Sequence, residues 1–241
     1  MRVFENQISC ILPTRGQTRK PLLFKCLSSF YDLASSPKQV EFIIVTDLDD
    51  RETRQDIETF LLDLNQDVKL IVRNRDLSNH SVNYVNYACQ CSSGNIIWGL
   101  NDEVECLTSG WDDILKDKMD CNHPMYGLID CNTKSKISIS LLENYGGSFP
   151  VLTRVAAEKI NGLLPKEINM WGADRELYLI FKRFKNIVDL TKDIKIKNHS
   201  YHSCPEEYSQ DELFSTGTNH SFNGELNDKQ INVYLDNLNS V

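Results

Sequence analysis

Short apolar runs alternate with amphipathic segments through the first hundred residues of the chain. Four of these runs are bounded by turn residues and are too short for helices, which predicts buried strands over residues 8–12, 42–45, 68–72 and 96–100. Between the strands, apolar residues recur at spacings of three and four, which predicts helices over about residues 21–31, 52–64 and 81–91. The pattern is typical of repeated strand–helix–strand units.

Units of this kind form a parallel sheet with right-handed crossovers, so the carboxyl ends of all the strands meet at one edge. Charged or phosphate-binding types of residue follow each of the four strands directly, over residues 13–19, 47–50, 73–76 and 102–105. Ligands of open α/β sheets bind in the crevice outside the carboxyl ends of the strands. The sequence therefore predicts a ligand site at this edge.

The fourth strand ends in a cluster of acids, Asp102, Glu103 and Glu105. Hard oxygen ligands of this kind suit Mg²⁺ or Mn²⁺ that carries phosphate groups. The alternative is a solvated acidic turn, because charged residues are found mostly at the surface.

Beyond residue 106 the alternation becomes irregular. The expected elements are a helix from 110, strands over 125–129 and 137–140, a helix that follows residues 149–153 and ends near 161–162, a helix from 170, strands over 187–190 and 194–196, and tail helices over 211–214 and 233–238. We expect a single α/β domain with a first half over residues 1–105, a second half over 106–205 and a helical tail over 206–241.

Composition narrows the class of protein. The 241 residues carry a net charge of −8 without a run of Lys or Arg, which argues against binding of nucleic acid through its phosphates. No apolar run approaches the ~18 residues of a transmembrane helix, and no signal peptide is expected. The eight cysteines include no C-x-x-C pair, which favours reduced thiols in a cytoplasmic protein.

Several short motifs occur in a fixed order along the chain. They are Ile11-Leu12-Pro13-Thr14-Arg15, the segment 44–50, Asn86 with Gly94, Asn101-Asp102-Glu103, Gly110-Trp111-Asp112 and Trp171-Gly172-Ala173-Asp174. In this order, over about residues 6–202, the chain resembles a nucleotide-sugar glycosyltransferase with the A-type fold and is most similar to family 2. The resemblance implies a GT-A-like (Rossmann-like) domain whose first half binds the nucleotide sugar and whose second half is a small acceptor-side subregion.

The resemblance also implies a set of donor-binding residues: Pro13, Thr14, Arg15, Asp47, Asp49, Arg75, Asn101 and Asp102. Asp47 would accept a hydrogen bond from the base or the ribose, and Arg75 would reach the base or the diphosphate. A solvated Arg15 and a surface ion pair of Arg75 with Asp76 or a glutamate are the alternatives.

A divalent cation, Mn²⁺ or Mg²⁺, is implied by the D-x-D element of the family. Here Leu100-Asn101-Asp102 aligns with that element and lacks its first acid, whereas a shifted register would use Glu103-Val104-Glu105. We expect Asp102 to bind the metal directly, with Glu103 as a helper. A histidine late in the chain, His199 or His202, would be a further ligand; plain surface histidines are the alternative.

Asp174 is the expected general base, because an inverting transfer needs a carboxylate that takes the proton of the attacking hydroxyl. Its place at the start of a helix is also one where Asp acts as a cap. Trp111 and Trp171 are candidates to stack on the acceptor sugar, and burial in the core is the alternative for both.

We therefore expect inverting, metal-assisted transfer of a sugar from a nucleoside-diphosphate donor, expected to be UDP-linked, to a hydroxyl of a glycan, a protein or a small molecule. Two rival functions remain. A nucleotidyltransferase would show a Gly-rich phosphate loop with Lys or Arg after the first strand, but residues 13–19 contain a single Gly. A catalytically inactive sugar-nucleotide-binding or interaction module is favoured by the incomplete D-x-D element.

Overall fold

A computed structural model of the chain describes residues 7–14, 19–48, 50–64, 68–73, 81–129, 149–168, 173–199 and 226–240. Its elements, in chain order, are β1 (Ile8–Pro13), α1 (Lys20–Asp32), the 3₁₀ turn η2 (Pro37–Gln39), β2 (Val40–Asp47), α2 (Arg51–Leu64), β3 (Val68–Arg73), α3 (Ser81–Cys91), β4 (Ile96–Gly99), β5 (Val104–Cys106), α4 (Trp111–Lys118), β6 (Tyr126–Leu128), β7 (Val151–Thr153), α6 (Arg154–Ile160), α7 (Ala173–Phe184), β8 (Ile187–Asp189), β9 (Ile196–Asn198) and α9 (Asp228–Asn239).

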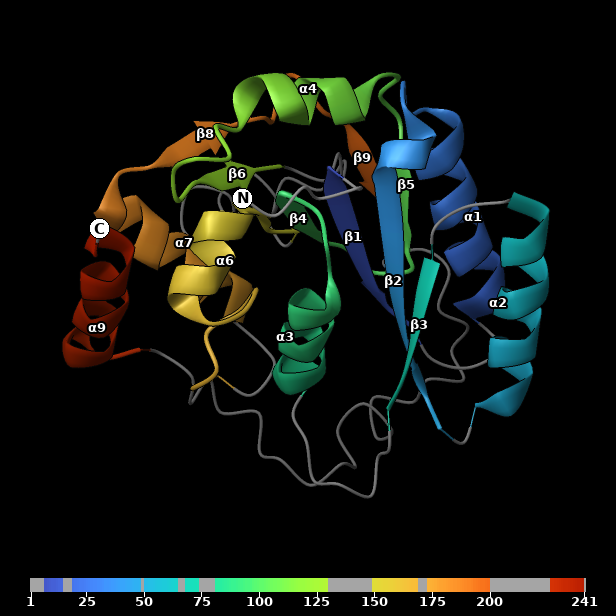
Figure 1. The fold of residues 1–241 in the computed structure, drawn as a ribbon, viewed down its shortest axis with the longest axis horizontal. Helices are drawn as coiled ribbons and strands as arrows, with labels where there is room; N and C mark the ends of the chain where they lie inside the picture. The colour runs from blue at the N-terminus through green and yellow to red at the C-terminus, as the bar shows by residue number, and fades with distance from the viewer. Residues whose placement is uncertain are drawn as a thin grey trace.

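The central sheet has seven strands in the order β3-β2-β1-β4-β7-β6-β8 (Figure 1). The four predicted strands of the first half, β1 to β4, pair in parallel, as the repeated units indicated. β7 then pairs antiparallel with β4, and β6 pairs antiparallel with β7. The predicted fold class, an α/β domain with a mostly parallel central sheet, is confirmed.

Most predicted elements lie within a few residues of the observed ones. The second strand begins at Val40 because this residue is the parallel partner of Ile8 on β1. The strand expected over 194–196 lies instead at Ile196–Asn198, where it pairs with β5. The strand expected over 137–140 and the helix expected over 211–214 lie outside the described residues.

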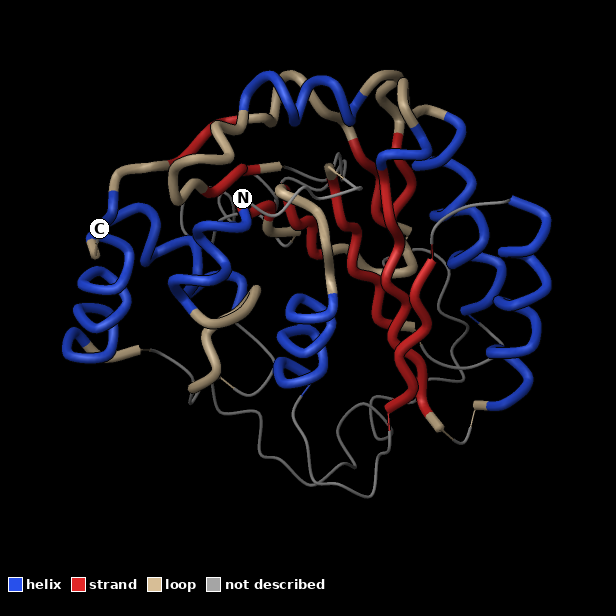
Figure 2. The backbone as a smooth tube through the Cα atoms, in the orientation of Figure 1, coloured by secondary structure: helices blue, strands red, loops and turns tan. Residues whose placement is uncertain are grey.

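Helices cover both faces of the sheet, and the alternation of side chains along each strand divides the core in two (Figures 1 and 2). One cluster joins α1, α2 and α4 to Cys10, Leu12, Phe42, Ile44 and Trp98. The other joins α3, α6, α7 and α9 to Ile11, Ile43, Val45 and Ile97. Because successive residues of a strand point to opposite faces, near-continuous apolar runs are what a sheet covered on both sides requires.

At the amino-terminal edge of the sheet, a buried carboxylate ties three strands together. Glu41 is fully buried and accepts a hydrogen bond from the Ser9 hydroxyl (2.5 Å) and one from the Gly94 amide (3.2 Å). The Gly94 amide also donates to the Ser9 hydroxyl (2.7 Å). This close approach requires glycine, since a Cβ at residue 94 would lie 2.5 Å from Ser9 Oγ and 2.7 Å from Ser9 N.

We expect Gly94→Ala to destabilise the fold by about 1–3 kcal/mol, the usual cost of overpacking a site that is already filled. Urea denaturation would measure the loss, with the neighbouring Asn95→Ala as a matched control. An unchanged free energy of unfolding in Gly94→Ala would show that β1 and β4 can separate at this point without cost.

Two further sequence expectations concern membrane spans and cysteines. No helix among the described residues is both long enough and apolar enough to cross a bilayer. The six cysteines in the described part of the chain form no disulfide with one another, and burial raises the pKa of Cys10 and Cys26 well above the ordinary value.

Candidate functional site

The strand order reverses between β1 and β4, because β2 and β3 lie on one side of β1 and β4 lies on the other. At such a switch point the loops after the two strands diverge and leave a crevice at their carboxyl ends. Thr14 follows β1 and Asp102 follows β4, and the Thr14 hydroxyl donates a hydrogen bond of 2.7 Å to Asp102 Oδ2. Two of the predicted donor-binding residues therefore meet at the switch point.

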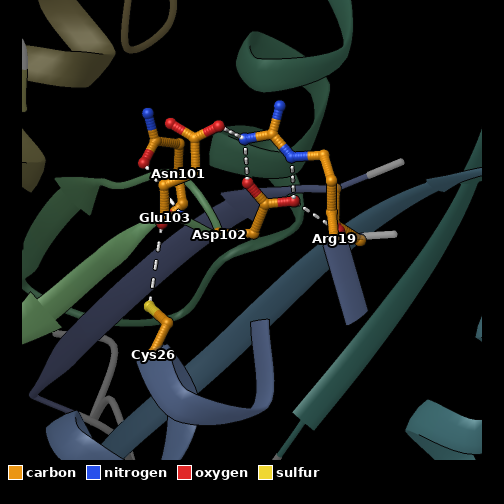
Figure 3. A network of polar contacts seen from close by, with 6 residues as sticks. Arg19, Cys26, Asn101, Asp102 and Glu103 are labelled. Atoms are coloured by element: carbon orange, nitrogen blue, oxygen red, sulfur yellow. Dashed lines mark hydrogen bonds and ion pairs between the residues drawn. The ribbon is translucent and has the colours of Figure 1, made fainter. Parts of the chain in front are cut away.

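Asp102 is held by a cationic side chain as well. Arg19 Nε donates to Asp102 Oδ2 (2.9 Å) and Arg19 Nη2 donates to Asp102 Oδ1 (2.5 Å), a bidentate pairing (Figure 3). The same Nη2 also contacts Glu103 Oε1. Burial raises the pKa of the Asp102 carboxyl, and Arg19 and the Thr14 hydroxyl oppose that rise without cancelling it.

Arg19 is the site residue that sequence reasoning missed. It is the last residue of the polar loop 13–19, in which only Pro13, Thr14 and Arg15 were expected to bind the donor, and it is the N-cap residue directly before α1. Its position could have been found from Pro21, which marks the first turn of the helix and so places Arg19 at the rim of the sheet. Its pairing with Asp102, 83 residues further along the chain, follows only from the tertiary structure.

A second cluster lies beside the first, where β5 pairs antiparallel with β9. The His199 amide donates to the Glu103 carbonyl (3.0 Å), so the predicted late histidine does reach the acidic segment. Its ring Nε2 lies 2.7 Å from Glu105 Oε2, and Lys25 Nζ lies 2.9 Å from the same oxygen. Partial burial tends to raise the pKa of Glu105, but the hydrogen bonds from Lys25 and His199 outweigh it and lower the pKa.

The geometry of these side chains does not fit a divalent cation. Asp102 and Glu103 both bind the Arg19 guanidinium, whereas Glu105 binds His199 and Lys25. No group of three or more Asp, Glu, His or Cys side chains that could hold a metal occurs among the residues that the structure describes. His202, the other candidate ligand, lies outside those residues.

The remaining donor-binding candidates divide into two groups. Asp47 is buried at the end of β2 and is the parallel partner of Arg73 on β3. Asn101 accepts a hydrogen bond of 3.3 Å from the Glu103 amide through its side chain, and its carbonyl lies 3.7 Å from the Cys26 thiol (Figure 3). Arg15, Asp49 and Arg75 lie outside the described residues.

Trp111 does not lie where an acceptor sugar could stack on it. The side chain is fully buried, its ring packs edge-on against Phe30 and Trp98, and its Nε1 donates a hydrogen bond of 2.8 Å to the Phe30 carbonyl. The expected acceptor contact is corrected to the alternative, a core residue. The neighbouring Asp112 accepts hydrogen bonds from the Ser35 and Ser36 amides, so this motif supports the fold. Trp171 lies outside the described residues.

Asp174 lies in the first turn of α7, where its carboxylate accepts a hydrogen bond of 2.9 Å from the Arg175 amide. Burial raises the pKa of Asp174, and the backbone hydrogen bonds oppose the rise. A carboxyl group with a raised pKa is a better proton acceptor than an ordinary aspartate, which suits a general base. The capping alternative is compatible with this position as well.

Asn86, a residue of one of the short motifs noted in the sequence, anchors the chain that leads toward Asp174. Its side-chain oxygen accepts hydrogen bonds from the Leu163 and Leu164 amides (2.8 and 2.9 Å), and its nitrogen donates to the Leu164 carbonyl (2.8 Å). The side chain therefore positions the segment after α6.

A cavity of about 270 Å³ lies elsewhere, between the ends of α3 and α6. Arg154 lines it, and the Arg154 guanidinium donates to the carbonyls of Gly94 and Cys89 and to the Ser92 hydroxyl. The contact with Cys89 satisfies a carbonyl in the last turn of α3, and the contact with Gly94 satisfies one in the loop that follows, so this arginine caps α3 near the amino-terminal edge of the sheet.

Solved structures share this fold. A fragment of S. aureus TarS in complex with UDP aligns with a TM-score of 0.59 and 14% identity, over 78% of this chain and 60% of that one. The mannosyltransferase PcManGT from Pyrobaculum calidifontis, in complex with GDP-Man and Mn²⁺, aligns with a TM-score of 0.61 and 15% identity, over 81% of this chain and 57% of that one. The TarS fragment in complex with UDP-GlcNAc gives a TM-score of 0.58 at 15% identity, over 95% of this chain and 70% of that one.

The likeness defines the class of fold, the GT-A-like arrangement with a mostly parallel sheet. This chain spans 60% of the length of the TarS fragment in complex with UDP, and at 14% identity the alignment concerns the fold alone. No protein-family model matches the sequence, and no curated protein matches it.

Proposed function

We propose that this chain is a glycosyltransferase of the family 2 type, which transfers a sugar from a nucleoside-diphosphate donor, UDP-linked, to a hydroxyl acceptor with inversion. The observation that carries the proposal is the meeting of Thr14 and Asp102 at the switch point between β1 and β4. Ligands of open α/β sheets bind in this place. Structures with the same fold hold UDP, UDP-GlcNAc and GDP-Man, which supports a nucleotide sugar as the ligand.

In this proposal the first half of the domain, residues 1–105, binds the donor. Pro13, Thr14 and Asp47 line the ends of β1 and β2, with Asp47 accepting a hydrogen bond from the base or ribose. Arg15, Asp49, Arg75 and Asn101 complete the donor-binding set. The acceptor, a glycan, a protein or a small molecule, binds to the second half, residues 106–205, where Trp171 stacks on a sugar face.

Asp174 acts as the general base. Its carboxylate takes the proton of the acceptor hydroxyl while the hydroxyl oxygen attacks the anomeric carbon. A new glycosidic C–O bond forms on one face as the C–O bond to the diphosphate breaks on the other, and the nucleoside diphosphate departs with the bonding electrons. Attack from the face opposite the leaving group inverts the configuration.

No step is routed through a metal ion, since the carboxylates of Asp102, Glu103 and Glu105 are engaged by Arg19, Lys25 and His199. The thiols of the buried cysteines support the expected cytoplasmic location, which is part of the proposal. An inactive nucleotide-sugar-binding module is the second candidate function, favoured by Asn101 in place of the first acid of the D-x-D element.

We expect the purified chain to release UDP slowly from one member of a panel of UDP-sugars, because glycosyltransferases hydrolyse their donors when no acceptor is present. A coupled assay for free UDP, run with and without a hydroxyl acceptor mixture, measures this release. Binding of a UDP-sugar without any release, with or without acceptors, would identify the chain as an inactive binding module.

A further inference from the structure

The side chains at the switch point are arranged with the cation outside and the carboxylates inside. The Arg19 side chain is 32% exposed, whereas those of Asp102 and Glu103 are 1% and 8% exposed. A ligand that arrives from solvent therefore meets the guanidinium first. In Figure 3 the second terminal nitrogen of Arg19 points away from both carboxylates.

Asp102 has little capacity left for a metal. Its Oδ2 accepts from Thr14 Oγ1 and Arg19 Nε, and its Oδ1 accepts from Arg19 Nη2. Mg²⁺ and Mn²⁺ need a carboxylate oxygen at close range with open space for their other ligands. Such an ion could bind Asp102 only after it displaced a bidentate, charge-assisted pairing whose carboxylate is 1% exposed.

The start of α1 adds positive potential beside the guanidinium. Arg19 is the N-cap residue directly before this helix of 13 residues, and no acidic side chain lies in the first turn of the helix. Aligned peptide dipoles place a partial positive charge at the beginning of a helix, where it favours anions. Arg19 therefore presents its charge together with that of the helix.

We propose that Arg19 supplies the positive charge that this site presents to the diphosphate of the donor, in place of a divalent cation. This role of Arg19 rests on the proposed function. Asp102 and Glu103 act on the donor indirectly, because they fix the guanidinium in position. Asn101 fits this arrangement: with an amide in place of the first acid of the D-x-D element, the site has one carboxylate fewer to hold a metal. A planar guanidinium with several N–H donors suits a phosphate group.

The test measures the affinity of the full chain for UDP and for GDP by isothermal titration calorimetry, once with Mn²⁺ and once with EDTA. We expect the same Kd in both conditions for the wild-type protein. Arg19→Gln should raise the Kd by about 10- to 100-fold, the loss typical of hydrogen bonds to a charged group.

Lys20→Gln is the matched control, since it removes one positive charge from the next residue, whose side chain pairs with Asp56. Its Kd should equal that of the wild type. Because Arg19→Gln leaves a buried Asp102 without its cation, the double variant Arg19→Gln/Asp102→Asn gives a second protein that lacks the guanidinium, and its Kd should rise by a similar factor.

The outcomes separate this inference from the proposed function. Nucleotide binding that requires Mn²⁺, or that persists at wild-type affinity without the guanidinium, would overturn the role of Arg19 and leave the transferase proposal intact. Failure of the wild-type chain to bind either nucleotide in both conditions would overturn the two together.

Discussion

Asp174→Asn is expected to abolish sugar transfer while the affinity for the donor nucleotide stays at the wild-type value. Asparagine has nearly the same shape as aspartate but cannot take the proton of the acceptor hydroxyl. The loss of a general base typically lowers kcat by about 10²- to 10⁴-fold. Initial rates of transfer and the Kd for UDP, measured on the same preparation, test this expectation.

A matched control lies two residues further along α7, in the same first turn. Glu176 is also an acid near the helix start, but its carboxylate accepts a hydrogen bond of 3.1 Å from the Leu226 amide and so connects α7 to the chain before α9. Glu176→Gln should change stability without comparable loss of kcat. Full transfer activity in Asp174→Asn would rule out Asp174 as the base.

The raised pKa of Asp174 gives the pH dependence a direction. A general base must be ionised, so kcat/KM should fall as pH falls through the pKa of Asp174. Because burial raises this pKa above the ordinary value for aspartate, the fall should begin at a higher pH than for an exposed carboxylate. A pH–rate profile of the wild-type protein measures the pH at which kcat/KM begins to fall.

Trp111→Ala is expected to cause the largest loss of stability, about 3–5 kcal/mol, which is typical of truncating a large aromatic residue in a core. The indole packs against Phe30 and Trp98, and its N–H satisfies the Phe30 carbonyl, which would lose this partner. A loss of this size lowers the melting temperature by roughly 10 °C in a protein of this length. Thermal and urea unfolding both measure it.

Trp111→Phe is the informative companion, because it keeps an aromatic ring at the site and removes the indole N–H. Its loss of stability should be smaller than that of Trp111→Ala. If instead both variants kept wild-type stability and only the KM for an acceptor rose, Trp111 would be a sugar-stacking residue and its assignment to the core would be wrong.

The local pattern of the sequence was sufficient for the framework of the fold. The bounds of β1, β3 and β4 and of the helices between them were predicted within a few residues. The reason is that a strand buried on both faces of the sheet is a run of consecutive apolar residues, which is easy to recognise in the sequence. The same signal placed Thr14, Asp47 and Asp102 after strand ends. The sequence signal was weakest for β9, because the position of this strand depends on its pairing with β5 rather than on its own apolar residues.

The candidate site was predicted only in part, because its contacts join residues far apart in the chain. Asp102 and His199 were expected in one region, and the His199 amide does donate to the carbonyl of Glu103, but the partner of each carboxylate could not be read from spacing. Arg19 pairs with Asp102 and Glu103, and His199 pairs with Glu105 rather than with Asp102. The cation that a buried acid binds depends on how side chains from different helices and strands are oriented in the folded chain.

By itself, the sequence determined the parallel framework, the edge at which polar strand ends gather and the helix that carries Asp174, since each depends on periodicity within a short stretch of chain. Only the tertiary structure decided that Trp111 belongs to the core and that a guanidinium holds the acids after β4. Burial and ion pairing are set by packing between distant segments, and one-dimensional spacing does not record them.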